Sequence, residues 1–96
     1  MSSQPEDILT INMKITGKVQ GVGFRYFVLR QAQDLGIKGW VRNKPNGDVE
    51  ALAQGEKVDL EQFIAKAKEG PSFSRVEGLS LNWVNETEQY FSFEII

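Results

Sequence analysis

The chain has 96 residues, of which 41% are hydrophobic and 25% charged, and its formal net charge is -2. This length allows one domain, and the composition is typical of a globular protein. The sequence contains no cysteine and no histidine, which excludes thiolate nucleophiles, disulfides and zinc fingers and removes the commonest general base. An enzyme with this sequence must therefore work without an imidazole.

Charge is distributed unevenly along the chain. Residues 1–44 carry seven Lys/Arg and three Asp/Glu, whereas residues 45–96 carry four and ten, so an anion site is expected in the first half. No apolar run approaches the ~20 residues of a membrane helix. Residues 1–7 are polar and acidic, unlike a secretory signal, and we predict a flexible tail, a single domain over residues 8–96 and a cytoplasmic protein without membrane or nucleic-acid partners.

The first third of the chain predicts a strand, a loop and a helix. Apolar and polar residues alternate over residues 8–16, which indicates a half-buried strand. Residues 17–23 contain three glycines and predict a loop. Over residues 24–35 the apolar residues recur at helical spacing, and Gly36 is a natural helix end.

The middle of the chain predicts a β-hairpin. Residues 37–43 and 48–54 indicate strands, and the Lys-Pro-Asn-Gly-Asp segment between them has the composition of a turn. The second strand is expected to bury Val49, Ala51 and Ala53. Asp48 and Glu50 share a strand face, and we expect both carboxylates to be exposed rather than a tuned pair.

The last third predicts a helix followed by two strands. The helix is expected over residues 59–69, with a capping box of Asp59 and Gln62 at its start. Strands follow over residues 75–84 and 91–96. The last strand is expected to direct Phe91, Phe93 and Ile95 inward.

The order β-α-β-β-α-β with an additional C-terminal strand predicts the α+β class. The expected architecture is a ferredoxin-like α/β sandwich with two helices on one face of an antiparallel sheet. This fold hosts binding modules, regulators and enzymes alike, so the function must come from particular residues.

The loop at Gly17–Arg25 is the first candidate site. Its glycines allow successive backbone N–H groups to face one centre, and the following helix start offers unpaired N–H groups and a positive dipole. Arg25 adds a donor fork suited to phosphate. A tight connection with an exposed arginine is an equally good interpretation of these residues alone. A cation at a helix start is unfavourable unless an anion binds there, which favours the functional interpretation. No nucleotide P-loop ending is present.

Asn43, at the end of the second predicted strand, is the second candidate. In a split βαβ fold this strand end can lie near the first loop, where its amide could both donate to and accept from a water molecule. The simpler interpretation is that Asn43 begins the hairpin turn, and turn preferences alone favour it.

Together the two segments resemble the acylphosphatase family. The first family pattern is matched by Ile15, Gly17, Val19, Gln20, Gly21, Val22, Phe24 and Arg25. The second is matched by Gly39, Trp40, Val41, Arg42, Asn43, Gly47, Val49 and Gly55. Two long motifs in the right order and separation make the resemblance specific.

The resemblance implies a ferredoxin-like fold and hydrolysis of acyl phosphates to carboxylate and inorganic phosphate. Carried over by position, Arg25 would bind the phosphoryl group and Asn43 would orient the attacking water. The backbone N–H groups that would hold the phosphate with Arg25 belong to Gln20, Gly21, Val22, Gly23, Phe24 and Arg25 itself. No metal and no cofactor are expected, and inorganic phosphate is expected as product and competitive inhibitor of a monomeric enzyme.

The absence of histidine fits this chemistry. The leaving carboxylate has a conjugate acid with a pKa of about 4 and needs no general acid. A loose phosphoryl-transfer transition state needs mainly positioning and charge stabilisation. The amide of Asn43 is a poor base, so a phosphate oxygen of the substrate is expected to take the proton of the water.

Three other functions remain open at this stage. The first is a ferredoxin-like module that binds a phosphate-bearing ligand without turnover. The second is single-stranded RNA binding on the sheet face, which is disfavoured because residues 49–53 lack aromatic and basic side chains. The third is an acylphosphatase-like domain of a larger carbamoyl-transfer protein, which is disfavoured because the 96-residue sequence looks self-contained and has no cysteine.

Overall fold

The computed structural model describes residues 7–85 and 88–96, so most of the predicted tail lies outside the described residues. Helix α1 and strand β4 have the predicted bounds, and the other elements differ from prediction by a few residues at their ends. The elements in chain order are β1 (Ile8–Lys18), α1 (Phe24–Leu35), β2 (Lys38–Asn43), β3 (Val49–Glu56), α2 (Lys57–Glu69), β4 (Arg75–Val84) and β5 (Phe93–Ile95).

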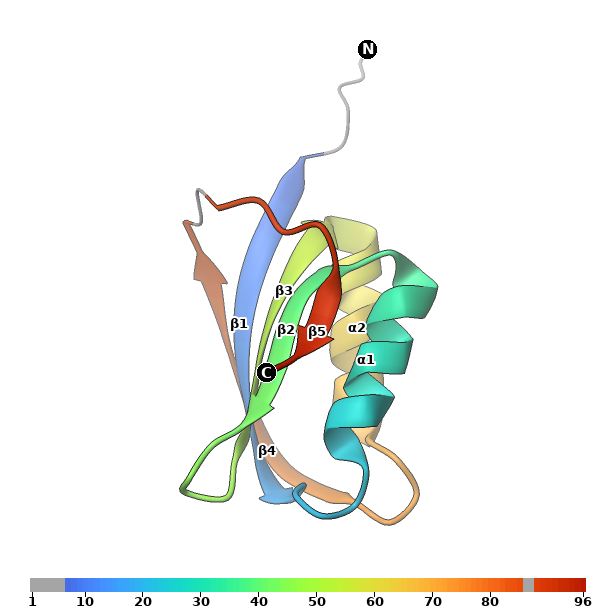
Figure 1. Cartoon of the computed structure of the whole chain (residues 1–96), viewed down its shortest axis with the longest axis vertical. Helices are drawn as coiled ribbons and strands as arrows, with labels where there is room; N and C mark the ends of the chain where they lie inside the picture. Colours follow the sequence, from blue (N-terminus) through green and yellow to red (C-terminus); the bar gives the residue numbers. More distant parts are fainter. Residues whose placement is uncertain (1–6, 86–87) are drawn as a thin grey trace.

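The strands form one sheet in the order β4-β1-β3-β2-β5, and both helices pack on the same face of it (Figure 1). The predicted ferredoxin-like sandwich is therefore confirmed. One strand pair differs from the expected antiparallel pattern, because β5 runs parallel to β2. Strand β5 thus forms the edge opposite β4 and makes the sheet mixed.

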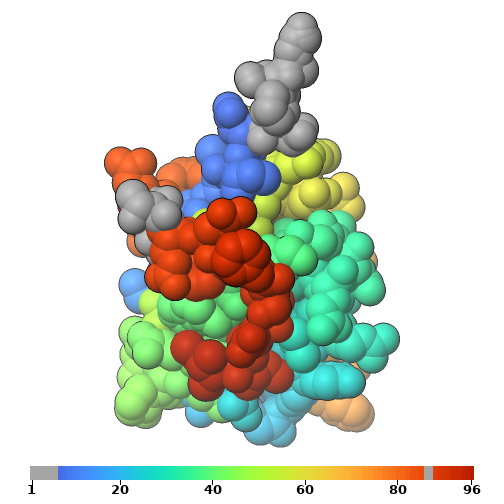
Figure 2. Space-filling model, turned by 45° about the horizontal axis from the view of Figure 1, so that its top comes forward, coloured from blue at the N-terminus to red at the C-terminus, as the bar shows by residue number. Residues whose placement is uncertain are grey.

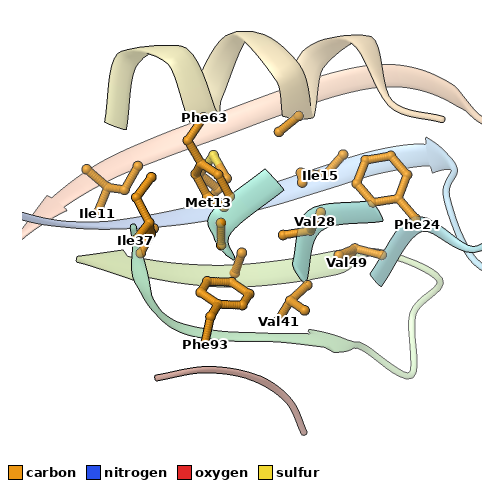
Figure 3. Close-up of a cluster of buried hydrophobic side chains, with 14 of the residues drawn as sticks. Ile11, Met13, Ile15, Phe24, Val28, Ile37, Val41, Val49, Phe63 and Phe93 are labelled. Atoms are coloured by element: carbon orange, nitrogen blue, oxygen red, sulfur yellow. The ribbon is translucent and has the colours of Figure 1, made fainter. Parts of the chain in front are cut away.

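The core lies between the sheet and the two helices (Figure 3). Strand β1 contributes fully buried side chains from alternate positions, as its apolar pattern predicts, and α2 contributes Phe63. The rings of Phe63 and Phe93 meet edge to face with centroids 6.0 Å apart, a favourable geometry for aromatic pairs. This contact fastens the short strand β5 to the core.

Two predictions near element ends are wrong. The capping box is absent, because α2 begins at Lys57 after Glu56 and no side chain caps its first N–H groups. Asp59 instead lies in the first turn, where its negative charge favours the helix dipole. Of the three residues of the last strand expected to point inward, only Phe93 is buried: Phe91 is 79% exposed and Ile95 is 39% exposed. The strand begins only at Phe93 and is a three-residue edge strand, so the predicted alternation is not realised on either side of Phe93.

Gly17 bends the end of β1 toward the loop that follows. The register between β1 and β4 shifts between Thr16 and Gly17, as at a β-bulge. Gly17 has a φ of 122°, and a Cβ there would overlap the backbone carbonyl of Arg75. Only glycine allows the two strands to approach so closely at this point, and the bend directs the chain into the glycine loop.

Glu50 is buried, against the expectation that it is exposed. It lies opposite Arg42 in the β2–β3 register, and only 7% of the residue is exposed. Arg42 donates to Glu50 Oε1 from Nε at 2.9 Å and from Nη2 at 2.7 Å, and Asn12 Nδ2 donates to Oε2 at 3.0 Å. Burial by itself raises the pKa of Glu50, but the hydrogen bonds from Asn12 and Arg42 and the charge of Arg42 outweigh it and hold the pKa below its ordinary value.

We expect Glu50→Gln to lower the free energy of unfolding at pH 7 by about 1–3 kcal/mol, since charge-assisted hydrogen bonds are lost. A lowered folded-state pKa means that the carboxylate stabilises the fold above its unfolded-state pKa and loses this effect as the pH falls. The difference between the two proteins should therefore shrink below the ordinary pKa of 4.5. Urea unfolding at several pH values measures it, and a difference that stays constant down to pH 3 would contradict the role of the charge.

Candidate active site

One pocket of about 200 Å³ lies where the glycine loop, the first turn of α1 and the end of β2 meet. The loop before α1 and the hairpin after β2 lie at the same end of the molecule, the lower end in Figure 1. The pocket is lined by Val19, Gly21, Gly23, Phe24, Arg25, Tyr26, Asn43 and Ile95.

The glycine loop offers backbone N–H groups to this pocket. Gly21 and Gly23 have φ values of 75° and 76°, which glycine adopts without strain. The first bond of the helix runs from the Phe27 N–H to the Gly23 carbonyl at 3.0 Å, so the N–H groups before it have no carbonyl one turn back. No side chain caps the helix and its first turn holds no acid, which leaves these donors and the positive dipole end for an anion.

Arg25 stands on this first turn, half-buried, and lines the pocket. Its guanidinium makes no ion pair or hydrogen bond with any residue that the structure describes. The ion pairs in the described part of the chain join Arg42 to Glu50 and Arg75 to Glu77. A partly buried guanidinium without a partner is matched in charge and geometry to a phosphate group.

Asn43 ends β2 and follows Val41 by two positions, so both side chains face the helix layer. Its Oδ1 atom is buried and has no hydrogen-bond partner within the described residues. The turn does not use this side chain, because Asn46 Oδ1 accepts from the Asp48 N–H at 3.0 Å. A buried acceptor without a donor costs about 1–3 kcal/mol, so this oxygen gains from a bound donor such as water.

Most of the predicted site residues meet at this pocket. Gly21, Gly23, Phe24, Arg25 and Asn43 line it. Gln20 and Val22 are not among its lining residues. Val22 packs against the core instead, and the Gln20 side chain donates to two carbonyls of the β2–β3 hairpin.

Sequence reasoning missed Val19, Tyr26 and Ile95 as lining residues. Val19 lies within the predicted loop and Tyr26 directly follows Arg25, so their proximity could have been inferred from the chain. Ile95 gives no such local signal, because it reaches the site through the parallel pairing of β5 with β2. Figure 2 shows this C-terminal segment, in red, on the surface between the green of β2 and the blue-green of α1.

Among residues 7–85 and 88–96, no three acidic side chains are grouped so that they could hold a metal ion. Within the same residues, no helix is long and apolar enough to cross a membrane. The polar side chains among the lining residues are those of Arg25, Asn43 and Tyr26.

The sequence model of one protein family matches this chain over residues 11–95, and the family is described as acylphosphatase. This range contains the whole pocket. The chain belongs to the acylphosphatase family. The likeness to individual members extends over nearly the full length of both chains.

Among curated relatives, the chain is 48% identical over 88 residues to an acylphosphatase from Lactobacillus gasseri, covering 91% of this chain and 97% of that protein. Among solved structures, the acylphosphatase from Bacillus subtilis matches with a TM-score of 0.89 and 39% identity, covering 92% and 98%. Full-length HypF, solved in its phosphate- and nucleotide-bound form, matches with a TM-score of 0.86 and 34% identity, covering 99% of this chain but 12% of that one. The chain thus has the size of the small acylphosphatases.

Proposed function

We propose that this chain hydrolyses the carboxyl-phosphate bond of small acyl phosphates to a carboxylate and inorganic phosphate. One observation carries the proposal: a guanidinium and a buried amide oxygen that have no partner among the described residues share one pocket with a helix start that no side chain caps. Because a single copy of the chain provides all of these groups, we propose that residues 8–96 act as one domain and as a monomer.

The phosphoryl group would lie between Arg25 and the glycine loop. The N–H groups of residues 20–25 would donate to its oxygens, and of these residues Gly21, Gly23, Phe24 and Arg25 line the pocket. Arg25 would add two parallel hydrogen bonds and a full positive charge. Donors fixed by the fold stabilise the charge that spreads over the equatorial oxygens in the transition state without reorganising during the reaction.

Asn43 would hold the attacking water. Its buried Oδ1 would accept one hydrogen from the water, which turns a lone pair of the water oxygen toward phosphorus. Holding a nucleophile at the correct distance and angle lowers the entropic part of the barrier. The amide is neutral and does not remove the proton, which would pass to a phosphate oxygen of the substrate.

The leaving group needs no protein acid. A carboxylate departs as the anion at neutral pH, since the pKa of its conjugate acid is about 4. The P–O bond to the carboxylate breaks, the water oxygen bonds to phosphorus, and its protons end on phosphate and solvent. The chain's own residues then supply binding, orientation and charge.

Turnover separates this proposal from a module that only binds phosphate. We expect the purified protein to hydrolyse benzoyl phosphate and acetyl phosphate in the presence of EDTA, with inorganic phosphate as a competitive inhibitor. Release of phosphate, corrected for spontaneous hydrolysis, measures the reaction. Phosphate binding without metal-independent turnover would show that the chain is a binding module.

Inorganic phosphate should also stabilise the fold, because it binds only the folded protein. At ten times its Kd the expected gain is about 1.4 kcal/mol, which corresponds to a rise in Tm of about 5–10 °C for a chain of this size. Thermal unfolding with sodium phosphate, compared with sodium chloride at equal ionic strength, tests this. Equal Tm values in the two salts at saturating concentration would argue against an anion site.

A further inference from the structure

The side chain of Gln20 ties the two halves of the site together. Its Nε2 donates to the Lys44 carbonyl at 2.8 Å and to the Asp48 carbonyl at 2.8 Å. These carbonyls stand at the two ends of the hairpin turn, which the Lys44 N–H closes by donating to the same Asp48 carbonyl. Both hydrogens of the amide are therefore used, and both go to the segment that begins directly after Asn43.

In the described part of the chain, these two bonds are the only hydrogen bonds that connect residues 19–23 with residues 44–48. The glycine loop carries the N–H groups, and Asn43 carries the amide oxygen. These groups lie in segments that are far apart in the sequence: the hydrogen bond from Gln20 to Lys44 spans 24 residues. Without the Gln20 side chain, the gap between them would depend on the packing of Val19 and the ends of the strands. Gln20 is half-buried, so its bonds are partly shielded from competing water.

The width of this gap matters for the reaction. The phosphoryl group and the attacking water must fit between the loop and Asn43 in line with the leaving oxygen. A displacement of about 1 Å between reacting groups can cost about 100-fold in rate, and designed sites need positions fixed within about 0.5 Å. Phosphate binding depends less on the gap, since Arg25 and the loop amides lie on one side of it.

We infer that the Gln20 side chain is a positioning residue, which holds Asn43 at the distance from the phosphate loop that in-line attack requires. This role is separate from the one predicted for its backbone N–H, and it rests on the proposed hydrolase function. The Gln20 side chain donates to the hairpin carbonyls, so it acts through the hairpin and not on phosphorus or the water. Its loss therefore lowers kcat and leaves the affinity for phosphate almost unchanged.

The test uses Gln20→Met, which has a similar length without donors, and Gln20→Glu, whose carboxylate repels the two carbonyls. We expect kcat for benzoyl phosphate to fall about 10–100-fold in Gln20→Met and further in Gln20→Glu. The inhibition constant of inorganic phosphate should stay within about twofold of the unsubstituted protein. Gln62→Ala, an exposed glutamine on α2, is the matched control and should leave both quantities unchanged.

Each other outcome overturns the inference. A kcat within twofold in both variants would mean that the bonds are dispensable. A parallel loss of kcat and phosphate affinity would assign Gln20 to the phosphate cradle. Far-UV circular dichroism checks folding, and if neither variant folded at any temperature the bonds would serve the fold. An inactive unsubstituted protein would instead refute the proposed function itself, which is measured first.

Discussion

Arg25→Gln should reduce turnover of benzoyl phosphate by about 1,000-fold or more and remove inhibition by inorganic phosphate at the same time. Arginines that stabilise the phosphoryl-transfer transition state contribute factors of this size. The guanidinium has no partner in the described part of the chain and lines the pocket. Its removal should therefore weaken the binding of phosphate and of the transition state alike. Steady-state kinetics and phosphate titration measure the two effects.

The same substitution, Arg25→Gln, should not destabilise the fold. Arg25 lies in the first turn of α1, where a positive charge opposes the helix dipole. Its removal should leave the free energy of unfolding unchanged or raise it by about 0.3–1 kcal/mol. Arg30→Gln, farther along the same helix, is the control and should keep turnover. Loss of turnover together with unfolding, or phosphate inhibition that survives, would contradict this role of Arg25.

Asn43→Ala should reduce kcat by about 100–1,000-fold, in the range found when one positioned donor or acceptor is removed from a catalytic site. Inhibition by inorganic phosphate should remain within about threefold, because Arg25 and the loop amides are intact. The side chain makes no hydrogen bond within the described residues, so its removal should not lower stability through a lost bond. Kinetics, phosphate inhibition and urea unfolding measure these three quantities.

Asn46→Ala is the matched control for this prediction. Asn46 is exposed, and its Oδ1 accepts a hydrogen bond from the Asp48 N–H within the turn. Its replacement should cost about 1 kcal/mol of stability and leave kcat nearly unchanged. If Asn43→Ala kept near-normal kcat, or if it lost phosphate affinity in parallel with turnover, the water-orienting role would be wrong.

The regular elements were predictable because their signals are local. Helix α1 has an apolar stripe and a glycine at its end, and β1 has strict alternation. Element ends were less predictable: α2 begins two residues earlier than the apparent capping box, since residues near a helix start can satisfy its N–H groups in several ways. Phe91 has the right spacing to join β5 but lies before the point where the chain pairs with β2.

The burial of Glu50 was also not predictable from local sequence signals. Asp48, two residues before it, and the acidic second half of the sequence predict a solvated carboxylate. The partners that compensate its burial, Arg42 and Asn12, come from two different strands. A carboxylate can be buried when opposite charge and hydrogen bonds meet it, and the pairing of strands decides whether they do.

The sequence by itself was enough to predict the ferredoxin-like fold, to recognise the acylphosphatase motifs and to exclude imidazole and thiol chemistry. Each of these conclusions depends only on local residue spacing or on composition. The sequence also predicted Arg25 and Asn43 as site residues, although for Asn43 turn preferences favoured a turn residue and only the family resemblance favoured a site residue. The tertiary structure decided that Asn46 serves the turn, that Asn43 lines the pocket beside Arg25 and that Ile95 joins them. It also revealed the link through Gln20. The pocket lining and the Gln20 hydrogen bonds depend on which residues, far apart in the sequence, come into contact. The sheet register and the order of the strands decide this, and neither has a local signature in the sequence.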